Sequence, residues 1–307
     1  MKHFSVTILG SSAAVPTTKR NLSAQVLSYG EQLILIDCGE GTQMMLRKLK
    51  IKANNISHIL ISHLHGDHFY GLIGLISTWH LMGRKTSLNI YGPEVLQEII
   101  ELQLKASMTQ LCYPLNFYHT QAEFPVMIAD TGKLTITSFP LVHRIPTTGF
   151  LISEKPLPRN VRRSEADKYG VPFVFMERLR QGEDFVDEDG NIVANHLLTI
   201  SPPQKRSYAY CSDTAFYEPI AEWTKGCSML YHEATFLNDK EEAAKQKMHS
   251  TAAQAAQIAL KANAGSLLLG HFSARYDDSN VFKIEAEKIF KNVVVAEDGA
   301  IYEINSS

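Results

Sequence analysis

The chain has 307 residues, of which 45% are hydrophobic and 20% are charged, and its formal net charge at pH 7 is -2. This length allows one large domain or two smaller ones with a packed core. A charge so close to zero excludes a strongly basic nucleic-acid-binding domain, so a polyanionic partner needs a local basic patch. No apolar run approaches the roughly 20 residues that span a bilayer, and the N-terminal MKHFSVTILG lacks signal-peptide features. We therefore expect a soluble cytoplasmic protein with no membrane partner.

The predicted elements alternate between strands and helices along the chain. Short β-branched or alternating runs predict strands over 4–9, 24–29, 33–37, 56–62, 88–92, 134–139, 149–153, 207–212, 229–234, 267–271 and 293–298. Helical spacing of apolar residues predicts helices over 69–82 and over 93–107, the second with a face formed by Val95, Ile99, Leu102 and Ala106. A third predicted helix begins at a Thr251 cap and ends at Gly265. The sequence therefore predicts a mixed α/β fold.

Residues 154–200 break this alternation. They contain three prolines, a DEDGN turn at 187–191 and an acidic stretch from Glu183 to Asp189. They also hold the richest basic cluster of the chain: Lys155, Arg159, Arg162, Arg163 and Lys168. We interpret this segment as an insertion within a single domain that covers residues 1–307. Its basic cluster is either a binding patch or an ordinary solvated face.

The four cysteines do not suggest a disulfide framework or a cysteine-bound metal. They are scattered and lack CxxC pairing: Cys38, Cys112, Cys211 and Cys227. We expect reduced and mostly buried thiols.

The stretch ISHLHGDHFYG (61–71) carries the strongest chemical signal. It places four ligand-type side chains on a predicted strand-to-helix loop: His63, His65, Asp67 and His68. Imidazoles and carboxylates suit Zn²⁺ and also Mn²⁺. The alternating spacing of the HxHxDH motif lets His63 and His65 reach one metal while Asp67 and His68 reach a second one. Two metals need more ligands, and three further candidates each follow a predicted strand: His143, Asp213 and His271.

In order and type, these residues resemble the metallo-β-lactamase superfamily. The resemblance implies a four-layer αββα sandwich with a two-zinc site at one edge of the paired sheets. Further stretches resemble the short-form ribonuclease Z family of endonucleases, which remove 3′ trailers from precursor tRNA: GSSAAVPTTKRN (10–21), DCGEGTQ (37–43), YHEATF (231–236), HSTAAQAA (249–256) and HFSARY (271–276). This second resemblance covers nearly the whole chain and is far more specific than HxHxDH alone.

Carried over position by position, the family pattern implies a complete dinuclear site. It puts His63, His65 and His143 on one zinc, Asp67, His68 and His271 on the other, and Asp213 between them. It also implies that Asp67 accepts a proton from the attacking water, and that His249, oriented by Glu233, protonates the leaving 3′ oxygen. The alternative is that Glu233 and His249 only cap helices or hold neighbouring groups.

The family resemblance also implies how tRNA is held. The 154–200 insertion would be a projecting arm that grips the tRNA elbow, with Arg159, Arg162, Arg163 and Lys168 facing phosphates. The arm of this chain has Gly170-Val171-Pro172 in place of the bacterial Gly-Pro motif. Near the active site, Lys19, Arg20 and Arg275 would contact substrate phosphate. The family acts as a homodimer in which the arm of one subunit serves the site of the other.

Two other functions remain open at the level of sequence. One is a superfamily hydrolase of a small ester, lactone or sulfate, which the HEATF motif and the insertion disfavour. The other is a metal-binding or RNA-binding module without turnover. Such a module would be expected to lack a ligand, and all seven ligand positions are filled.

Overall fold

The computed structural model describes residues 2–306. By their internal contacts these residues form two compact units. The first consists of residues 2–153 with 206–305, and the second of Glu154–Lys205 with Ser306. The second unit begins where the predicted insertion begins, and it ends at Lys205 in place of residue 200.

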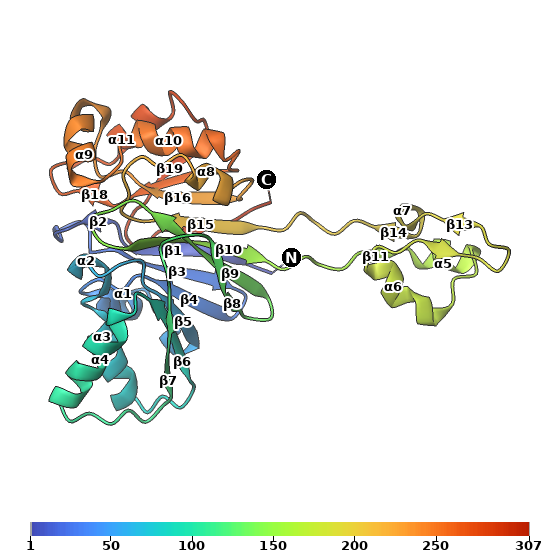
Figure 1. Ribbon diagram of the computed structural model, residues 1–307, viewed down its shortest axis with the longest axis horizontal. Helices are drawn as coiled ribbons and strands as arrows, with labels where there is room; N and C mark the ends of the chain where they lie inside the picture. Colours follow the sequence, from blue (N-terminus) through green and yellow to red (C-terminus); the bar gives the residue numbers. More distant parts are fainter. Residues whose placement is uncertain (1, 307) are drawn as a thin grey trace. The chain divides into compact units, whose positions relative to one another are not determined.

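Two seven-stranded sheets form the centre of the first unit, within the described part of the chain (Figure 1). The first sheet has the order β20 (Ile301–Glu303), β1 (Phe4–Gly10), β3 (Ala24–Tyr29), β4 (Gln32–Ile36), β5 (Ile56–Leu60), β6 (Leu88–Gly92) and β7 (Leu115–His119). The second has the order β19 (Val293–Val295), β17 (Leu267–Gly270), β16 (Met229–Glu233), β15 (Ser207–Cys211), β10 (Thr147–Glu154), β9 (Leu134–Leu141) and β8 (Val126–Asp130). Strands β4, β5, β6 and β7 pair in parallel in the first sheet, and β15, β16, β17 and β19 pair in parallel in the second.

Three apolar cores hold these layers together. Side chains of both sheets, including Phe4, Phe150 and Tyr208, meet in a core between them. A second core joins the outer face of the first sheet to α1 (Thr42–Lys48), α3 (Leu72–Leu81) and α4 (Val95–Ala106). A third joins the second sheet to α8 (Ile220–Trp223), α10 (Ala252–Lys261) and α11 (Asn280–Ala286). Since each fully buried large apolar side chain contributes about 1.5–3 kcal/mol, these cores fix the predicted αββα order of layers.

Shorter elements complete the first unit. Strand β2 (Ser12–Ala13) pairs in parallel with β18 (Phe272–Ser273), and this pairing brings the loop after β1 beside the loop after β17. The other short elements are α2 (Gly66–Phe69), α9 (Glu241–Lys247), η1 (Ala53–Asn55) and η3 (Asn238–Lys240). Helix α10 begins at Thr251 with a capping box, because the Thr251 side chain accepts from Gln254 N and the Gln254 side chain accepts from Thr251 N. The predicted Thr251 cap is therefore confirmed.

The predicted helix over 69–82 is wrong in its first turn. The chain forms α2 and then α3, with a break at Tyr70 and Gly71. Gly71 N–H donates to the carbonyl of Cys38 (2.9 Å), a residue outside both helices. A Cβ on Gly71 would lie 2.1 Å from the Gly39 carbonyl oxygen, so only glycine allows these two loops to pack this closely.

Of the four residues predicted to form the apolar face of α4, Ile99 packs against the core, but the other three are exposed: Val95, Leu102 and Ala106. Leu96 and Ile100 are the buried residues of this helix, whereas Val95 and Leu102 are 52% and 66% exposed. The sequence contains two stripes at helical spacing, and periodicity alone does not distinguish them. Packing against the first sheet selects the stripe that contains Leu96.

The second unit is small and has its own core. It contains β11 (Asn160–Val161), α5 (Arg163–Lys168), η2 (Phe173–Phe175), α6 (Met176–Arg180), β12 (Phe185–Val186), β13 (Ile192–Val193), α7 (Asn195–Leu198) and β14 (Thr199–Ile200). Its buried core consists of Ala166, Val171, Leu179, Phe185, Val193 and Leu198. The buried Asn195 amide donates to the carbonyls of Leu179 and Glu183, both at 2.8 Å, and accepts from Thr199 Oγ1. This network satisfies backbone groups that short strands leave unpaired.

None of the helices among residues 2–306 combines the length and the apolar character needed to cross a membrane.

Candidate metal centre and active site

The ligand-type residues predicted from sequence meet at one edge of the two sheets. The HLHGDH loop follows β5, His143 follows β9, Asp213 follows β15 and His271 follows β17. Strands β5, β15 and β17 lie in the parallel parts of their sheets, so their carboxyl ends bring these loops together. Two of the residues that build this edge have left-handed backbone, Asp37 with φ 55° and His271 with φ 57°. Such backbone is uncommon outside glycine and often marks functional sites.

The first group of donor atoms consists of His63, His65, His143 and Asp213. His65 Nδ1 lies 3.1 Å from His63 Nε2 and 3.2 Å from His143 Nε2. Asp213 Oδ2 lies 3.8 Å from His63 Nε2 and 3.7 Å from His143 Nε2. The four donor atoms therefore face a common point, as ligands of one cation would.

The second group consists of Asp67, His68 and His271, with the other oxygen of Asp213. Asp213 Oδ1 lies 3.2 Å from His68 Nε2 and 3.1 Å from His271 Nε2. Asp67 Oδ2 lies 3.4 Å and 3.5 Å from the same two nitrogens. Because its two oxygens face different groups, Asp213 has the position of a bridge between them.

Hydrogen bonds at the Nδ1 atoms fix the orientation of four of these imidazoles. His63 Nδ1 bonds to the Ser62 hydroxyl (3.0 Å), and His68 Nδ1 bonds to the Asp37 carboxylate (2.7 Å). His143 Nδ1 bonds to the Met248 carbonyl (2.9 Å), and His271 Nδ1 bonds to the Thr235 hydroxyl (3.0 Å). The carboxylate and the carbonyl accept a hydrogen bond from Nδ1–H. The two hydroxyls also accept, because they donate their own hydrogens to Asp37 and Glu233. All four partners therefore select the tautomer whose Nε2 is free to bind a metal. Each ring therefore presents Nε2 to the group of donor atoms.

Asp37 and Thr235 hydrogen-bond two of the candidate ligands, and sequence reasoning missed both residues. The Asp37 carboxylate accepts from His68, from the Ser62 hydroxyl (2.9 Å) and from the Tyr210 hydroxyl (2.6 Å). Thr235 donates to Glu233 Oε2 (2.7 Å) and bonds to His271. Both residues lie in stretches quoted for the family resemblance, DCGEGTQ and YHEATF. The histidines that they bond, His68 and His271, lie 31 and 36 residues away in sequence, so only the fold reveals the pairing.

The chemistry of this donor set fits divalent cations. His68 Nε2 and His271 Nε2 are buried and have no hydrogen-bond partner within residues 2–306, which is costly for a polar atom unless something binds there. Burial by itself raises the pKa of the Asp213 carboxyl, but the imidazoles of His271 and His68 outweigh it and hold that pKa well below its usual range. The carboxylate is thus ionised, as a metal ligand must be.

His249 and Glu233 form a hydrogen-bonded pair beside the two groups. His249 Nδ1 donates to Glu233 Oε1 at 2.7 Å, and Glu233 is fully buried. Burial disfavours the charged His249 ring, but the Glu233 carboxylate outweighs it and raises the pKa of His249 to about 9. His249 also lies close enough to Asp213 and His271 to be a ligand. Its Nδ1 is already used by Glu233, which leaves Nε2 available for another role.

A hollow of about 630 Å³ opens over these groups. Arg275 lines it, and the guanidinium lies 5.0 Å from the centre of the Phe236 ring; its predicted contact with substrate phosphate stays a prediction. Sequence reasoning missed Arg144 and Lys247, which also line the hollow and could have been suspected as neighbours of His143 and His249. It also missed Tyr70, which is 66% exposed beside the metal loop. Cations and an exposed aromatic ring are the groups that bind phosphates and unstacked bases.

Lys19 and Arg20 do not line this hollow. They line a smaller one of about 330 Å³ together with Asp277 and Asp298. The Arg20 guanidinium donates to the Tyr276 carbonyl and lies 5.7 Å from the centre of the Phe272 ring. Burial lowers the pKa of Arg20. Arg20 therefore ties its own loop to the segment after β18, and the predicted phosphate contact of both residues stays a prediction.

The four basic residues predicted in the insertion lie within the second unit. Arg163 pairs with Asp167 (3.0 Å) and Lys168 with Glu165 (2.8 Å), and all four side chains are partly or largely exposed. Arg159 Nε donates to Thr199 Oγ1 at 2.7 Å. Arg162 is exposed and has no ion pair within residues 2–306. Exposed pairs of this kind contribute little to stability and can exchange for phosphate.

Comparison with solved structures defines the class of protein first. The metallo-β-lactamase fold protein YhfI from Bacillus subtilis matches with a TM-score of 0.70 and 19% identity, over 99% of this chain and 100% of that one. This chain therefore has the metallo-β-lactamase fold. The sequence model of the family described as anti-Pycsar protein Apyc1 matches residues 4–156.

More similar relatives then define the family. Ribonuclease Z of Bacteroides thetaiotaomicron is 44% identical over 306 residues, which cover 100% of this chain and 97% of that protein. Ribonuclease Z of Porphyromonas gingivalis strain W83 is 39% identical over 97% of this chain and 98% of that protein. The short form of human tRNase Z matches with a TM-score of 0.72 and 28% identity, over 98% and 99% of the two chains. The chain belongs to the ribonuclease Z family, as its motifs predict.

Proposed function

We propose that this chain is a metal-dependent endoribonuclease that removes the 3′ trailer from precursor tRNA. Cleavage leaves a 3′-hydroxyl on the tRNA and a 5′-phosphate on the trailer. The observation that carries the proposal is the convergence of seven ligand-type side chains, next to the His249–Glu233 pair, in a chain of the ribonuclease Z family.

The proposed cofactors are two Zn²⁺ ions per subunit, for which Mn²⁺ could substitute. His63, His65 and His143 would hold one ion, Asp67, His68 and His271 the other, and Asp213 both. Two such ions would lower the pKa of a bound water and would neutralise charge on the attacked phosphate. The imidazole-rich, carboxylate-bridged donor set supports this assignment.

Asp67 and His249 would move the two protons of the reaction. Asp67 accepts the proton of the attacking water, and its Oδ2 is held in place by the backbone N–H of Ala14 at 2.9 Å. His249 protonates the leaving 3′ oxygen of the tRNA through Nε2, because Nδ1 is bound to Glu233. Glu233 orients the ring and keeps it protonated at neutral pH.

Basic residues in both units would hold the substrate. In the first unit, Arg275, Arg144 and Lys247 line the hollow over the metal centre and would bind phosphates near the scissile bond. In the second unit, Arg159, Arg162, Arg163 and Lys168 would bind phosphates of the tRNA body, so this unit would be the tRNA-binding arm. If so, deletion of residues 154–205 raises KM for precursor tRNA and spares hydrolysis of bis(p-nitrophenyl) phosphate.

The proposed assembly is a homodimer and the proposed location is the cytoplasm. Exposed apolar side chains at the ends of α3 and α4, including Leu81, Leu102 and Met108, support a protein interface there. The four cysteines are free, which agrees with a reducing compartment. Sedimentation analysis of the protein would test the dimer.

The decisive experiment incubates the purified protein with a precursor tRNA that carries a 3′ trailer, with and without chelator, and maps the new ends. We expect one cut after the discriminator base, a 3′-hydroxyl product and complete inhibition by chelator. No cut, combined with chelator-sensitive hydrolysis of a small ester, lactone or sulfate, would contradict the proposal and favour the small-molecule hydrolase.

A further inference from the structure

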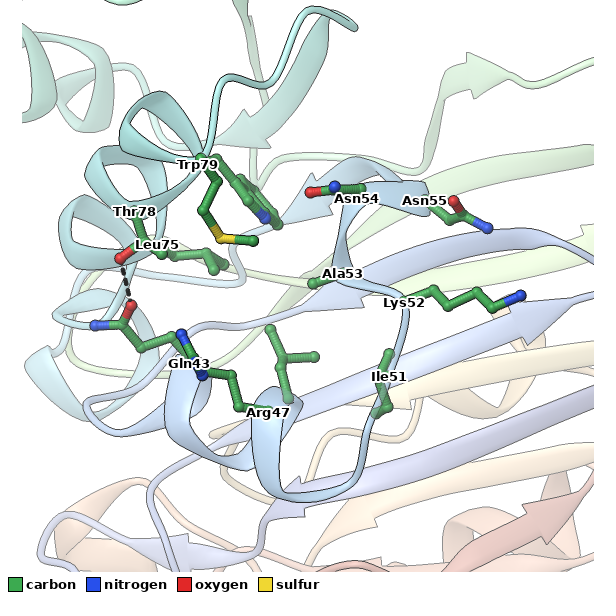
Figure 2. Close-up of a pocket in the computed structure, with 12 residues that line it drawn as sticks. Gln43, Arg47, Ile51, Lys52, Ala53, Asn54, Asn55, Leu75, Thr78 and Trp79 are labelled. Atoms are coloured by element: carbon green, nitrogen blue, oxygen red, sulfur yellow. Dashed lines mark hydrogen bonds between the residues drawn. The ribbon is translucent and has the colours of Figure 1, made fainter.

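Tyr70 lies beside the candidate metal centre and differs in its exposure from other aromatic side chains that line hollows of the first unit. It follows α2, lines the hollow over the metal centre and is 66% exposed. Phe236 lines the same hollow but is 1% exposed. Trp79 is also 1% exposed, although it lines a second cavity of about 480 Å³ between α1, Ile51–Asn55 and α3 (Figure 2). Of these three rings, only that of Tyr70 offers a face to a ligand.

The HLHGDH loop and its neighbour hold the Tyr70 ring in place. A Cβ on Gly66 would lie 2.2 Å from Tyr70 Cε2, so the ring rests on the backbone of this glycine. The Phe69 ring, which is 7% exposed, meets the Tyr70 ring edge to face, with ring centres 4.9 Å apart. The Tyr70 hydroxyl has no hydrogen-bond partner within residues 2–306. A supported ring of this kind loses little freedom when a second flat ring stacks on it.

The cations of the hollow gather near His249. Two of the three lysines and arginines that line it lie beside the Phe236 ring, Lys247 at 5.8 Å and Arg275 at 5.0 Å from the ring centre. The centre of the Phe236 ring is in turn 6.2 Å from that of His249. Lysine and arginine side chains are the usual partners of RNA phosphates. This side of the hollow therefore suits the phosphate backbone of a substrate.

The lining around Asp67 is apolar or acidic. Ala14 N–H donates to Asp67 Oδ2 at 2.9 Å, and Ala14 and Pro16 are exposed residues of one loop that line the hollow. Glu40 also lines it, and a Cβ on the glycine before Glu40 would lie 2.4 Å from the Asp67 carbonyl oxygen. Tyr70 belongs to this side, because its ring rests on the residue before Asp67. An uncharged base fits here better than a phosphate does.

We propose that Tyr70 stacks with the base of the first trailer nucleotide, which lies on the 3′ side of the cleaved bond. This role rests on the proposed function, in which His249 protonates the leaving 3′ oxygen of the tRNA. That step places the last nucleotide of the tRNA near His249, with its phosphates among the cations. The first trailer nucleotide stays joined to the attacked phosphate through its 5′ oxygen, so its unpaired base is the one left for the side of Tyr70. Because every base has a π-face, the stack positions trailers of any sequence.

The first test compares a precursor tRNA that has its natural first trailer nucleotide with one that has an abasic nucleotide there. For the natural chain we expect kcat/KM to be about tenfold lower on the abasic precursor, the equivalent of about 1.4 kcal/mol. Tyr70→Ala should lose about tenfold on the natural precursor and little more on the abasic one, because both changes remove the same stack. Tyr70→Phe keeps the ring and should restore most of the loss. Tyr118→Ala is the matched control, since Tyr118 is 46% exposed and does not line the hollow.

The second test needs no turnover. Chelator-treated protein is mixed with a precursor tRNA that carries 5-iodouridine as the first trailer nucleotide, and the complex is irradiated. Because iodouracil forms a photochemical crosslink to an aromatic ring stacked on it, we expect mass spectrometry to map the crosslink to Tyr70. The crosslink should be lost in Tyr70→Ala and kept in Tyr118→Ala. A crosslink that maps to another residue, or that persists in Tyr70→Ala, would overturn the assignment.

The outcomes distinguish failure of the stack from failure of the proposed function. If the natural chain does not cut the natural precursor, the proposed nuclease function has failed. If it cuts the natural and the abasic precursor at the same rate, or if Tyr70→Ala and the abasic nucleotide reduce kcat/KM additively, only the stack is refuted. A third precursor is abasic at the last tRNA nucleotide: if Tyr70→Ala is non-additive with that change instead, Tyr70 contacts the tRNA and not the trailer. Equal bound metal in Tyr70→Ala and the natural chain, measured by mass spectrometry, verifies that the HLHGDH loop is intact.

Discussion

The metal centre of the first unit and the basic surface of the second unit use charge in opposite ways. Around the metal centre, His63, His68 and Asp213 are almost fully buried, and hydrogen bonds to Ser62 and Asp37 fix the Nδ1 atoms of the two rings. In the second unit, Arg163 and Lys168 are exposed and pair with acids on their own helix. Chemistry needs donor atoms that do not reorganise during the reaction, whereas phosphate recognition needs charges that can exchange partners. Substitutions in the metal centre and in the second unit should therefore affect the reaction in different ways.

The largest loss should follow Asp213→Ala. Both groups of donor atoms lose a shared carboxylate, and four buried imidazoles lose their neighbouring negative charge. We expect cleavage of precursor tRNA to fall by at least about 10³-fold, together with a loss of bound metal measured by mass spectrometry. Asp239→Ala removes an exposed carboxylate of the same unit and is the matched control. Full metal content and activity in Asp213→Ala would remove this residue from the centre.

His249→Ala should cause the next largest loss of cleavage rate, but with a different effect on bound metal. Loss of a general acid costs roughly 10²–10⁴-fold in rate, whereas both metals should remain bound because Nδ1 of His249 is already used by Glu233. A substrate with sulfur as the bridging leaving atom needs no proton, so it should recover much of the lost rate. His119→Ala, at an exposed histidine, is the control. A fall in metal content would instead identify His249 as a ligand beside Asp213 and His271.

The Leu179→Ala substitution should distinguish the role of the second unit from that of the metal centre. Leu179 is fully buried in a core of only six buried apolar residues, and such a truncation costs about 2–5 kcal/mol. A unit of about fifty residues has little stability to lose, so limited proteolysis should cut within Glu154–Lys205. KM for precursor tRNA should rise about tenfold or more, with bis(p-nitrophenyl) phosphate hydrolysis unchanged. Equal loss on both substrates would mean that the first unit depends on the second for its folding.

The same contrast explains what the sequence could predict. The residues that meet at the candidate metal centre were recognisable because HLHGDH and the strand ends before His143, Asp213 and His271 are local features. The roles of Asp37 and Thr235 were not, because their partners are distant in sequence. The break before α3 depends on the contact of Gly71 with Gly39, which no local pattern contains.

The basic loop and helix α4 show two further limits of local patterns. Lys19 and Arg20 looked like active-site cations, yet Arg20 is bound to the Tyr276 carbonyl and lines another hollow. On α4 two stripes have the same period, and the sheet selected Leu96 and Ile100. Local patterns therefore predicted which ligand-type side chains the fold brings together, whereas long-range packing decided which charges and apolar faces are exposed.

The smallest predicted effect tests whether free charges in the second unit matter more than paired ones. Arg162 and Arg163 are adjacent and exposed, but Arg163 pairs with Asp167 at 3.0 Å and Arg162 has no ion pair within residues 2–306. Arg162→Ala should raise KM for precursor tRNA about threefold and reduce the slope of log KM against log salt by about one. Arg163→Ala should do less, since Asp167 already offsets that charge. Neither should alter bis(p-nitrophenyl) phosphate hydrolysis. If the two variants weaken tRNA binding equally, the phosphate displaces Asp167 from Arg163 at no cost in free energy. The affinity for tRNA then depends on the number of cations in the cluster and not on their pairing.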